Sequence, residues 1–171
     1  SLADNQLELL LQQDNCEGIE LPVKRIARVL EGAVPDLILS DLEKEWLQKL
    51  NHLLSSDKTP VLYTSRGELT FSTDSARRNF SNTLACLMAR LAANVSPRLG
   101  YLISKGGITT HVFLEKGLQV QSVQLKGQLL PGLSLVCADS YLPNKGLPIV
   151  TFPGNLGQKE TLLSAWKLME N

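Results

Sequence analysis

Apolar and polar residues follow one another along this chain with two different spacings, one typical of helices and one typical of strands. Apolar positions three and four residues apart predict amphipathic helices over 3–13, 23–30, 40–54, 73–95, 109–116 and 158–169. Short apolar runs predict strands at 18–23, 60–64, 98–103, 119–126, 132–138 and 147–152. The strands 119–126 and 132–138 are expected to pair through a turn around Pro131-Gly132.

Three local signals set expected helix boundaries. The segment Ser40-Asp41-Leu42-Glu43 has the form of a capping box, in which the serine and glutamate side chains satisfy exposed backbone donors, and it predicts a helix start at Ser40. Pro97 is expected to end the long helix that begins near Thr73. Gly117 is expected to be the C-terminal cap of the short helix 109–116.

The succession of helices and strands predicts the fold class. Strands that alternate with helices through connections of moderate length are typical of α/β domains. We therefore expect a three-layer α/β/α domain with a largely parallel, mixed central sheet. The chain has 171 residues, without an internal repeat or a low-complexity linker, so a single domain over residues 1–171 is the expectation.

Composition excludes several classes of function. Seventeen basic residues balance 17 acidic ones, which argues against partners that need a basic surface, namely nucleic acids and membrane surfaces. No apolar run approaches the ~18 residues of a membrane span, and no secretory signal is visible. The three cysteines lie far apart in apolar surroundings, as expected of free buried thiols in a reducing compartment. These features predict a cytoplasmic protein.

Two glycine loops are the candidate binding elements. Lys105-Gly106-Gly107-Ile108-Thr109-Thr110 and Pro153-Gly154-Asn155-Leu156-Gly157 each follow a predicted strand and precede a predicted helix. Backbone N–H groups of such loops converge on anions, and parallel strands bring them to one edge of a sheet. The two loops together therefore indicate one phosphate-rich ligand. The alternative for each loop is an ordinary tight turn, with a threonine cap in the first.

Other candidates carry weaker signals. The loop Thr64-Ser65-Arg66-Gly67 follows a third predicted strand and is expected at the same sheet edge if the three strands are parallel. Arg66 is either a phosphate contact or, as we favour, a solvated surface residue. His111 is expected to be a half-buried structural histidine rather than a general base. No cysteine or histidine pair has metal-ligand spacing and no nucleophile motif occurs, so neither a metal site nor a catalytic residue is assigned.

Four blocks of sequence carry a family resemblance. They span Leu102 to Thr109, Lys116 to Leu118, Gly127 to Ser134 and Gly146 to Gly157. In order and spacing they resemble the C-terminal nucleotide-binding domain of the four-carbon acid sugar kinases, which include 3-oxo-tetronate and threonate kinases. Residues 98–168 resemble this domain well. The first 97 residues do so more loosely, through the early helix with Gln6-Leu7 and the long helix.

The resemblance implies an ATP-dependent kinase of two domains. An N-terminal domain would bind the sugar acid, and this chain would bind ATP with Mg²⁺. The nucleotide-contacting residues would be Gly106, Gly107, Ile108 and Thr109 in one loop and Gly154 in the other. The catalytic base is expected on the N-terminal domain, and this chain is expected to be a fragment that lacks that domain and also the family's Gly-Ser-rich segment before the first helix.

Ile108 is a departure from the family pattern, because many relatives have an acidic residue there. It favours a rival hypothesis, a non-catalytic interaction or regulatory module whose nucleotide site has degenerated. A second rival is an enzyme that uses a dinucleotide. The absence of a G-x-G-x-x-G motif counts against it.

Overall fold

The computed structural model describes residues 1–67, 69–138 and 146–171. Its helices are α1 (Leu2–Leu11), α2 (Val23–Leu30), α3 (Pro35–Ser55), α4 (Asp74–Val95), α5 (Gly107–Val112) and α6 (Thr161–Glu170), with a 3₁₀ turn at Ser96–Arg98 and a π-helical turn at Phe113–Gly117. Its strands are β1 (Cys16–Leu21), β2 (Thr59–Thr64), β3 (Leu102–Lys105), β4 (Val123–Leu130), β5 (Leu133–Ala138) and β6 (Pro148–Phe152).

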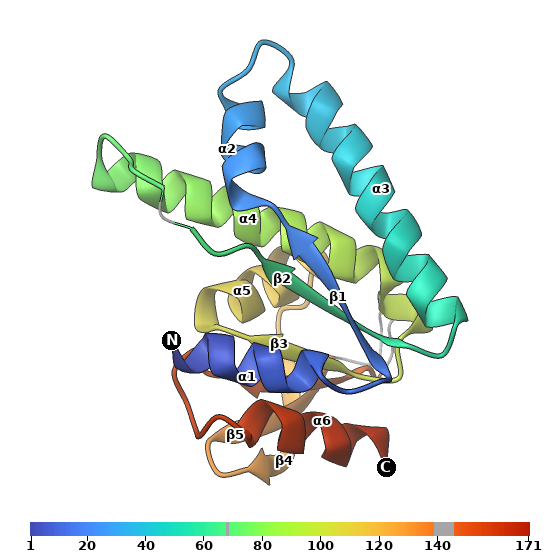
Figure 1. The fold of residues 1–171 in the computed structure, drawn as a ribbon. Coiled ribbons are helices and arrows are strands. Elements are labelled where there is room, and N and C mark those ends of the chain that lie inside the picture. The colour runs from blue at the N-terminus through green and yellow to red at the C-terminus, as the bar shows by residue number, and fades with distance from the viewer. Residues whose placement is uncertain (68, 139–145) are drawn as a thin grey trace.

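The strands lie in two hydrogen-bonded sheets with helices packed against them (Figure 1). Strands β1 and β2 form a parallel pair, while the second sheet has the order β3-β6-β5-β4. In that sheet β3 and β6 are parallel, whereas β5 and β4 continue it in antiparallel fashion. The α/β class and the mixed sheet are thus confirmed. The expected single sheet is divided in two, although Val61 of β2 packs in the same apolar cluster as Ile103 of β3.

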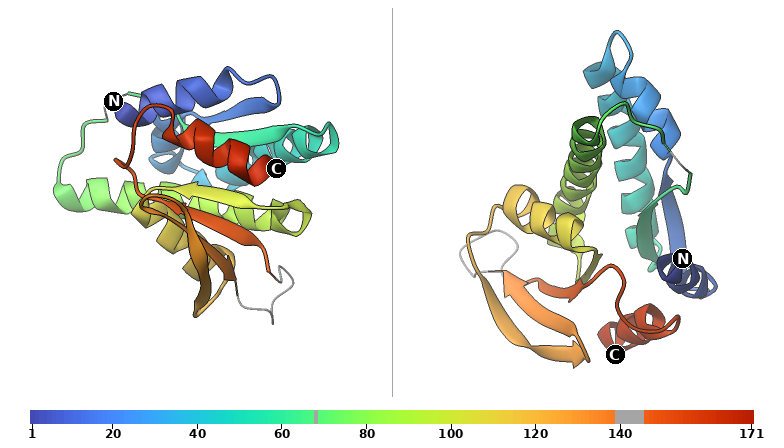
Figure 2. Two further views of the ribbon diagram at one scale, coloured as in Figure 1. Left: turned by 90° about the horizontal axis from the view of Figure 1, so that it is seen from below. Right: turned by 90° about the vertical axis from the view of Figure 1, so that its left-hand side faces the viewer.

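Helix α4 is the central support of the fold (Figure 2). One of its faces buries Leu87 and Leu91 against α3, α2 and β1, where Ile26 and Leu21 are completely buried. Its alanine-bearing side packs against α5, the π-helical turn and the second sheet. On the other side of this sheet, α1 and α6 lie together over β6. Burial of these apolar faces is what holds the helices on the sheets.

Helix α3 begins at Pro35, so the predicted start at Ser40 is wrong. Proline is well suited to the first helical position because its fixed φ is helical and its missing N–H would have no partner there. Leu39, Leu42 and Trp46 are all buried, so the buried stripe already includes the residue before Ser40, while Leu37 and Ile38 are exposed. Packing of this stripe outweighs the capping sequence.

Gly117 does not cap the short helix in the predicted way. It is the last residue of the π-helical turn and its φ is not positive, so no left-handed cap forms. A Cβ at this position would lie 3.1 Å from the carbonyl oxygen of Ala89 and 3.1 Å from the Phe113 ring. Glycine here permits close contact with α4, which is a packing role.

The remaining boundaries follow the prediction within a few residues. The long helix ends just before Pro97, and Gly132, with φ +80°, lies in the turn between β4 and β5. Strand β3 starts later than expected because Ser96–Arg98 forms a 3₁₀ turn. In the described part of the chain, no helix has both the length and the apolar character needed to cross a bilayer.

Candidate functional site

The two glycine loops lie side by side at the ends of β3 and β6. These strands are parallel, with Lys105 opposite Phe152, and the N–H of Gly106 donates to the carbonyl of Phe152 at 2.8 Å. The loops that leave the two strands are therefore hydrogen-bonded neighbours. The predicted convergence of both loops on one sheet edge is confirmed, whereas the Thr64–Gly67 loop follows a strand of the other sheet.

The first loop is fixed by glycine geometry and a buried threonine. Gly106 has φ +105°, a conformation that residues with a side chain rarely adopt. The Thr110 hydroxyl lies 2.8 Å from Ser104 Oγ and 2.9 Å from the carbonyl oxygen of Gly106, which ties the start of α5 to the end of β3. The threonine that stabilises this turn is therefore Thr110, and the Thr109 side chain does not take part in these hydrogen bonds.

The backbone beyond Gly106 is open to an approaching molecule. Within the described residues, the N–H groups of Gly107, Ile108 and Thr109 have no hydrogen-bond partner, as expected at a helix start. A Cβ at Gly107 or at Gly154 would meet no atom within 4 Å. The Ile108 side chain is 68% exposed. Three backbone donors, with free space beside them, thus stand next to an exposed apolar side chain.

The second loop is held from the opposite side by Gln6 of α1. The Gln6 side chain is completely buried, and its Nε2 donates to the carbonyls of Leu156 at 3.1 Å and Gln158 at 2.7 Å. Its Oε1 has no partner among the described residues. From the sequence, Gln6 was noted only within the family resemblance. The available signal was a polar residue four positions before buried Leu10, on the helix face that should be apolar.

Gly157 has a structural role in the same loop. Its φ is +84°, and a Cβ there would lie 2.4 Å from Thr161 Oγ1. That hydroxyl accepts the N–H of Gln158 at 2.8 Å, so the loop folds tightly onto the start of α6. The two glycines of this loop differ, since Gly154 leaves space open and Gly157 allows close packing.

Lys105 joins the two loops, a role that its position in the sequence did not predict. Its Nζ donates to the Gly154 carbonyl at 2.8 Å and lies 4.0 Å from the centroid of the Phe152 ring. Burial of the ammonium lowers the pKa of Lys105. Lys105 also forms no ion pair in the part of the chain that the structure describes.

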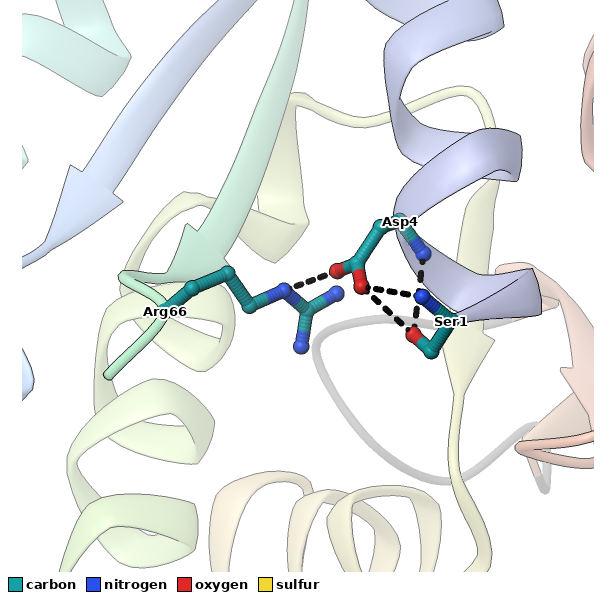
Figure 3. Close-up of polar contacts among 3 residues, drawn as sticks. All are labelled: Ser1, Asp4 and Arg66. Carbon is teal, nitrogen blue, oxygen red and sulfur yellow. Dashed lines mark hydrogen bonds and ion pairs between the residues drawn. The ribbon is translucent and has the colours of Figure 1, made fainter. Parts of the chain in front are cut away.

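Arg66 is engaged by an acidic residue of α1 rather than free for a ligand (Figure 3). Its Nε contacts Asp4 Oδ1, while Asp4 Oδ2 lies 2.8 Å from the amino group of Ser1 and 2.7 Å from its hydroxyl. Hydrogen bonds from that amino group and hydroxyl, together with the Arg66 charge, lower the pKa of Asp4 to about 2. Arg66 is thus the exposed surface residue that we favoured, with an ion-pair partner.

His111 lies close to the first loop, but its prediction as a half-buried residue is wrong. Its side chain is 73% exposed and pairs with Glu115 at 3.4 Å, one turn along the helix. In residues 1–67, 69–138 and 146–171, no group of three histidine, cysteine or acidic side chains is arranged to hold a metal ion. Cys16, Cys86 and Cys137 are free thiols; Cys16 is buried as predicted, whereas the prediction of burial is wrong for Cys86 and Cys137, which are partly exposed.

An α/β domain whose adjacent parallel strands end in glycine loops at one sheet edge has the arrangement in which many α/β proteins bind their ligands. Residues 1–162 match the family described as the nucleotide-binding C-terminal domain, and the chain belongs to this family. The family is that of the four-carbon acid sugar kinases, so the resemblance seen in the four sequence blocks is confirmed. No protein of curated function is similar enough to count as a match.

Solved structures show the same fold. One is a domain of unknown function (DUF1537) from Bordetella bronchiseptica, solved with bound citrate as a domain-swapped dimer in two crystal forms. The chain is 20% and 19% identical to them, with TM-scores of 0.69 and 0.72, and it covers 36% and 38% of their length with 98% and 99% of its own. A Haemophilus influenzae protein of the same family is 16% identical, with a TM-score of 0.68, over 98% of this chain and 38% of that one. The chain thus spans little more than a third of these relatives.

Proposed function

We propose that this chain is the ATP-binding part of a kinase that phosphorylates a four-carbon sugar acid of the 3-oxo-tetronate or threonate class. The observation that carries the proposal is the hydrogen bond from Gly106 N–H to the Phe152 carbonyl. This bond holds the two glycine loops side by side, so that they can form a single site. Family membership supports the nucleotide as the ligand of that site. Gly106, Gly107, Ile108, Thr109 and Gly154 are the proposed nucleotide contacts.

The residues present fit an ATP polyphosphate chain. The unpaired N–H groups of Gly107, Ile108 and Thr109 are donors of the kind that cradle phosphate oxygens. The free space at Gly107 and Gly154 lets a ligand reach the backbone. ATP, once bound, supplies the phosphoryl group, and this chain's part is to hold and orient it.

Magnesium enters this proposal with the nucleotide. Mg²⁺ in such sites keeps several waters and binds phosphate oxygens together with one or two carboxylates. The described residues offer no cluster of three acidic or histidine side chains for a metal. Because one or two carboxylates suffice for Mg²⁺ beside phosphate oxygens, the absence of such a cluster does not decide the question, and we assign no magnesium ligand in this chain.

The acceptor site belongs, in this proposal, to an N-terminal substrate-binding domain of the same protein. The solved relatives are almost three times as long as this chain, which leaves room for such a domain. Phosphoryl transfer would take place in the cytoplasm, between ATP on this domain and the sugar acid on the other. The base that accepts the hydroxyl proton would come from that other domain.

A non-catalytic interaction module is the second candidate, and Ile108 favours it. An isoleucine that is 68% exposed in the loop is unsuited to contact phosphates through its side chain. In this alternative, the glycine loops would keep their fold and would no longer bind nucleotide.

Calorimetric titration with Mg·ATP tests the proposal. The wild-type chain should bind in the micromolar to millimolar range, and Gly107→Val should weaken binding by roughly tenfold or more because its side chain fills the space beside the loop. Gly100→Ala is the matched control, since it lies before β3, away from the loops, with no atom within 4 Å of the added Cβ. Absence of heat from the full-length protein at millimolar Mg·ATP would refute the kinase and favour the interaction module.

A further inference from the structure

Lys105 places a positive charge at the junction of the two glycine loops. It is the last residue of β3, and its ammonium reaches across to β6, to the Gly154 carbonyl at 2.8 Å and to the Phe152 ring at 4.0 Å. Both contacts belong to the second loop or to the strand before it. The charge therefore lies between the two segments whose backbones form the candidate site.

The charge of Lys105 is not balanced by a neighbouring acid. Among the described residues it enters no ion pair, whereas Arg66 pairs with Asp4 and Arg90 with Glu43. An ammonium group has three N–H donors, and among residues 1–67, 69–138 and 146–171 the Gly154 carbonyl is the one acceptor that Lys105 Nζ contacts. Partial burial without a counter-ion disfavours the charged form and lowers the pKa of Lys105. An anion bound at this place would restore the balance.

We propose that Lys105 is the phosphate-binding cation of this site, which neutralises the polyphosphate chain of the nucleotide while it holds the two loops together. This inference rests on the proposed function and adds the residue that supplies the charge. The ligand feature it recognises is the phosphate group, so inorganic pyrophosphate should bind at the same place as ATP. Adenosine, which has no phosphate, should gain nothing from Lys105.

Two substitutions separate the charge of Lys105 from its loop contact. Lys105→Met removes both, and Lys105→Gln removes the charge but keeps an N–H donor for the Gly154 carbonyl. Hydrogen bonds to charged groups contribute about 1.5–3 kcal/mol, so both variants should bind Mg·ATP and pyrophosphate about 10- to 100-fold more weakly. Lys126→Met is the matched control, because Lys126 is exposed on β4 and contacts Gln124 of its own strand at 2.6 Å. It should bind like the wild type.

Titrations at two salt concentrations complete the test. Binding of Mg·ATP to the wild type should weaken as salt rises, and this dependence should be smaller in Lys105→Gln. Wild-type affinity for Mg·ATP in both Lys105 variants, or in Lys105→Gln alone, would overturn the inference and leave the proposed function standing. Failure of the wild type to bind either Mg·ATP or pyrophosphate would overturn both.

Discussion

Replacement of Gln6 by methionine should loosen the second glycine loop without changing the volume of the core. Methionine matches glutamine closely in length and shape, but it lacks the amide that donates to the carbonyls of Leu156 and Gln158 at 3.1 and 2.7 Å. Gln6 is completely buried, so solvent does not reach its side chain in the wild type. The change therefore removes two hydrogen bonds that fasten the loop to α1.

The magnitude follows from three contributions. Each lost hydrogen bond costs about 0.5–1.5 kcal/mol, which gives a destabilisation of about 1–3 kcal/mol. Removal of the buried Oε1, which has no partner among the described residues, returns about 1 kcal/mol. The carbonyl of exposed Gln158 can be hydrated after the change, so it adds little. The net expectation is a destabilisation of about 0–2 kcal/mol, with a central value of about 1 kcal/mol.

Urea unfolding followed by tryptophan fluorescence measures this difference, since Trp166 lies in the apolar cluster beneath the loop. Gln13→Met is the control, because Gln13 Nε2 also donates to a carbonyl, that of Leu9 at 3.1 Å, but this bond is local, since Gln13 follows the end of α1 and Leu9 lies in its last turn. It should change the free energy of unfolding by less than about 0.5 kcal/mol. Equal stabilities of Gln6→Met and Gln13→Met would refute the role given to Gln6.

A pH series sharpens the test through Gln6→Glu. An ionised carboxylate at this buried position would face two carbonyl oxygens, so the pKa of the introduced carboxyl should be raised in the folded state. With a raised pKa in the folded state, the stability of the variant is full below the ordinary carboxyl pKa of about 4.3. It falls as pH rises from that value through the raised pKa, because the carboxyl then loses its proton. Gln6→Glu should therefore resemble Gln6→Met near pH 4 and be less stable than it at pH 7.

Two other changes test the roles assigned to individual residues. Gly157→Ala should destabilise the fold by about 2 kcal/mol or more, since φ is +84° and the Cβ would lie 2.4 Å from Thr161 Oγ1. Gly154→Ala should leave the melting temperature nearly unchanged and weaken Mg·ATP binding; equal melting of the two variants would contradict this. Burial raises the pKa of the Cys16 thiol to about 11, so at pH 8 a disulfide reagent should modify Cys16 far more slowly than Cys86. Equal rates in the folded protein, compared with Cys16→Ser, would count against this burial.

The sequence predicted the helices well wherever an apolar stripe decides their extent. Helix α4 and the turn at Pro131-Gly132 follow directly from spacing and from turn residues. The start of α3 was missed because a local capping sequence at Ser40 competes with the burial of Leu39 one residue earlier. The division into two sheets could not be foreseen, since strand pairing depends on contacts between distant segments.

The candidate site was predictable in its backbone and not in its side chains. A strand, a glycine loop and a helix in succession place a loop at a sheet edge, and two such units with parallel strands place two loops together. The contacts of Lys105 and Gln6 with the second loop bridge 49 and 150 or more residues of sequence. No spacing rule connects such distant positions, although a glutamine on an apolar helix face was a local hint.

Carbonyl groups of the second loop accept hydrogen bonds from Lys105 on one side and from Gln6 on the other, and this affects ligand binding. Lys105 engages the carbonyl of Gly154 and Gln6 engages those of Leu156 and Gln158, so the loop is ordered before any ligand arrives. Ordering in advance lowers the entropic cost of binding and acts equally at low and high salt. A charge acts through an electrostatic attraction that salt screens. If both residues support nucleotide binding, loss of Gln6 should therefore weaken it by a factor independent of salt, whereas loss of Lys105 should weaken it most at low salt.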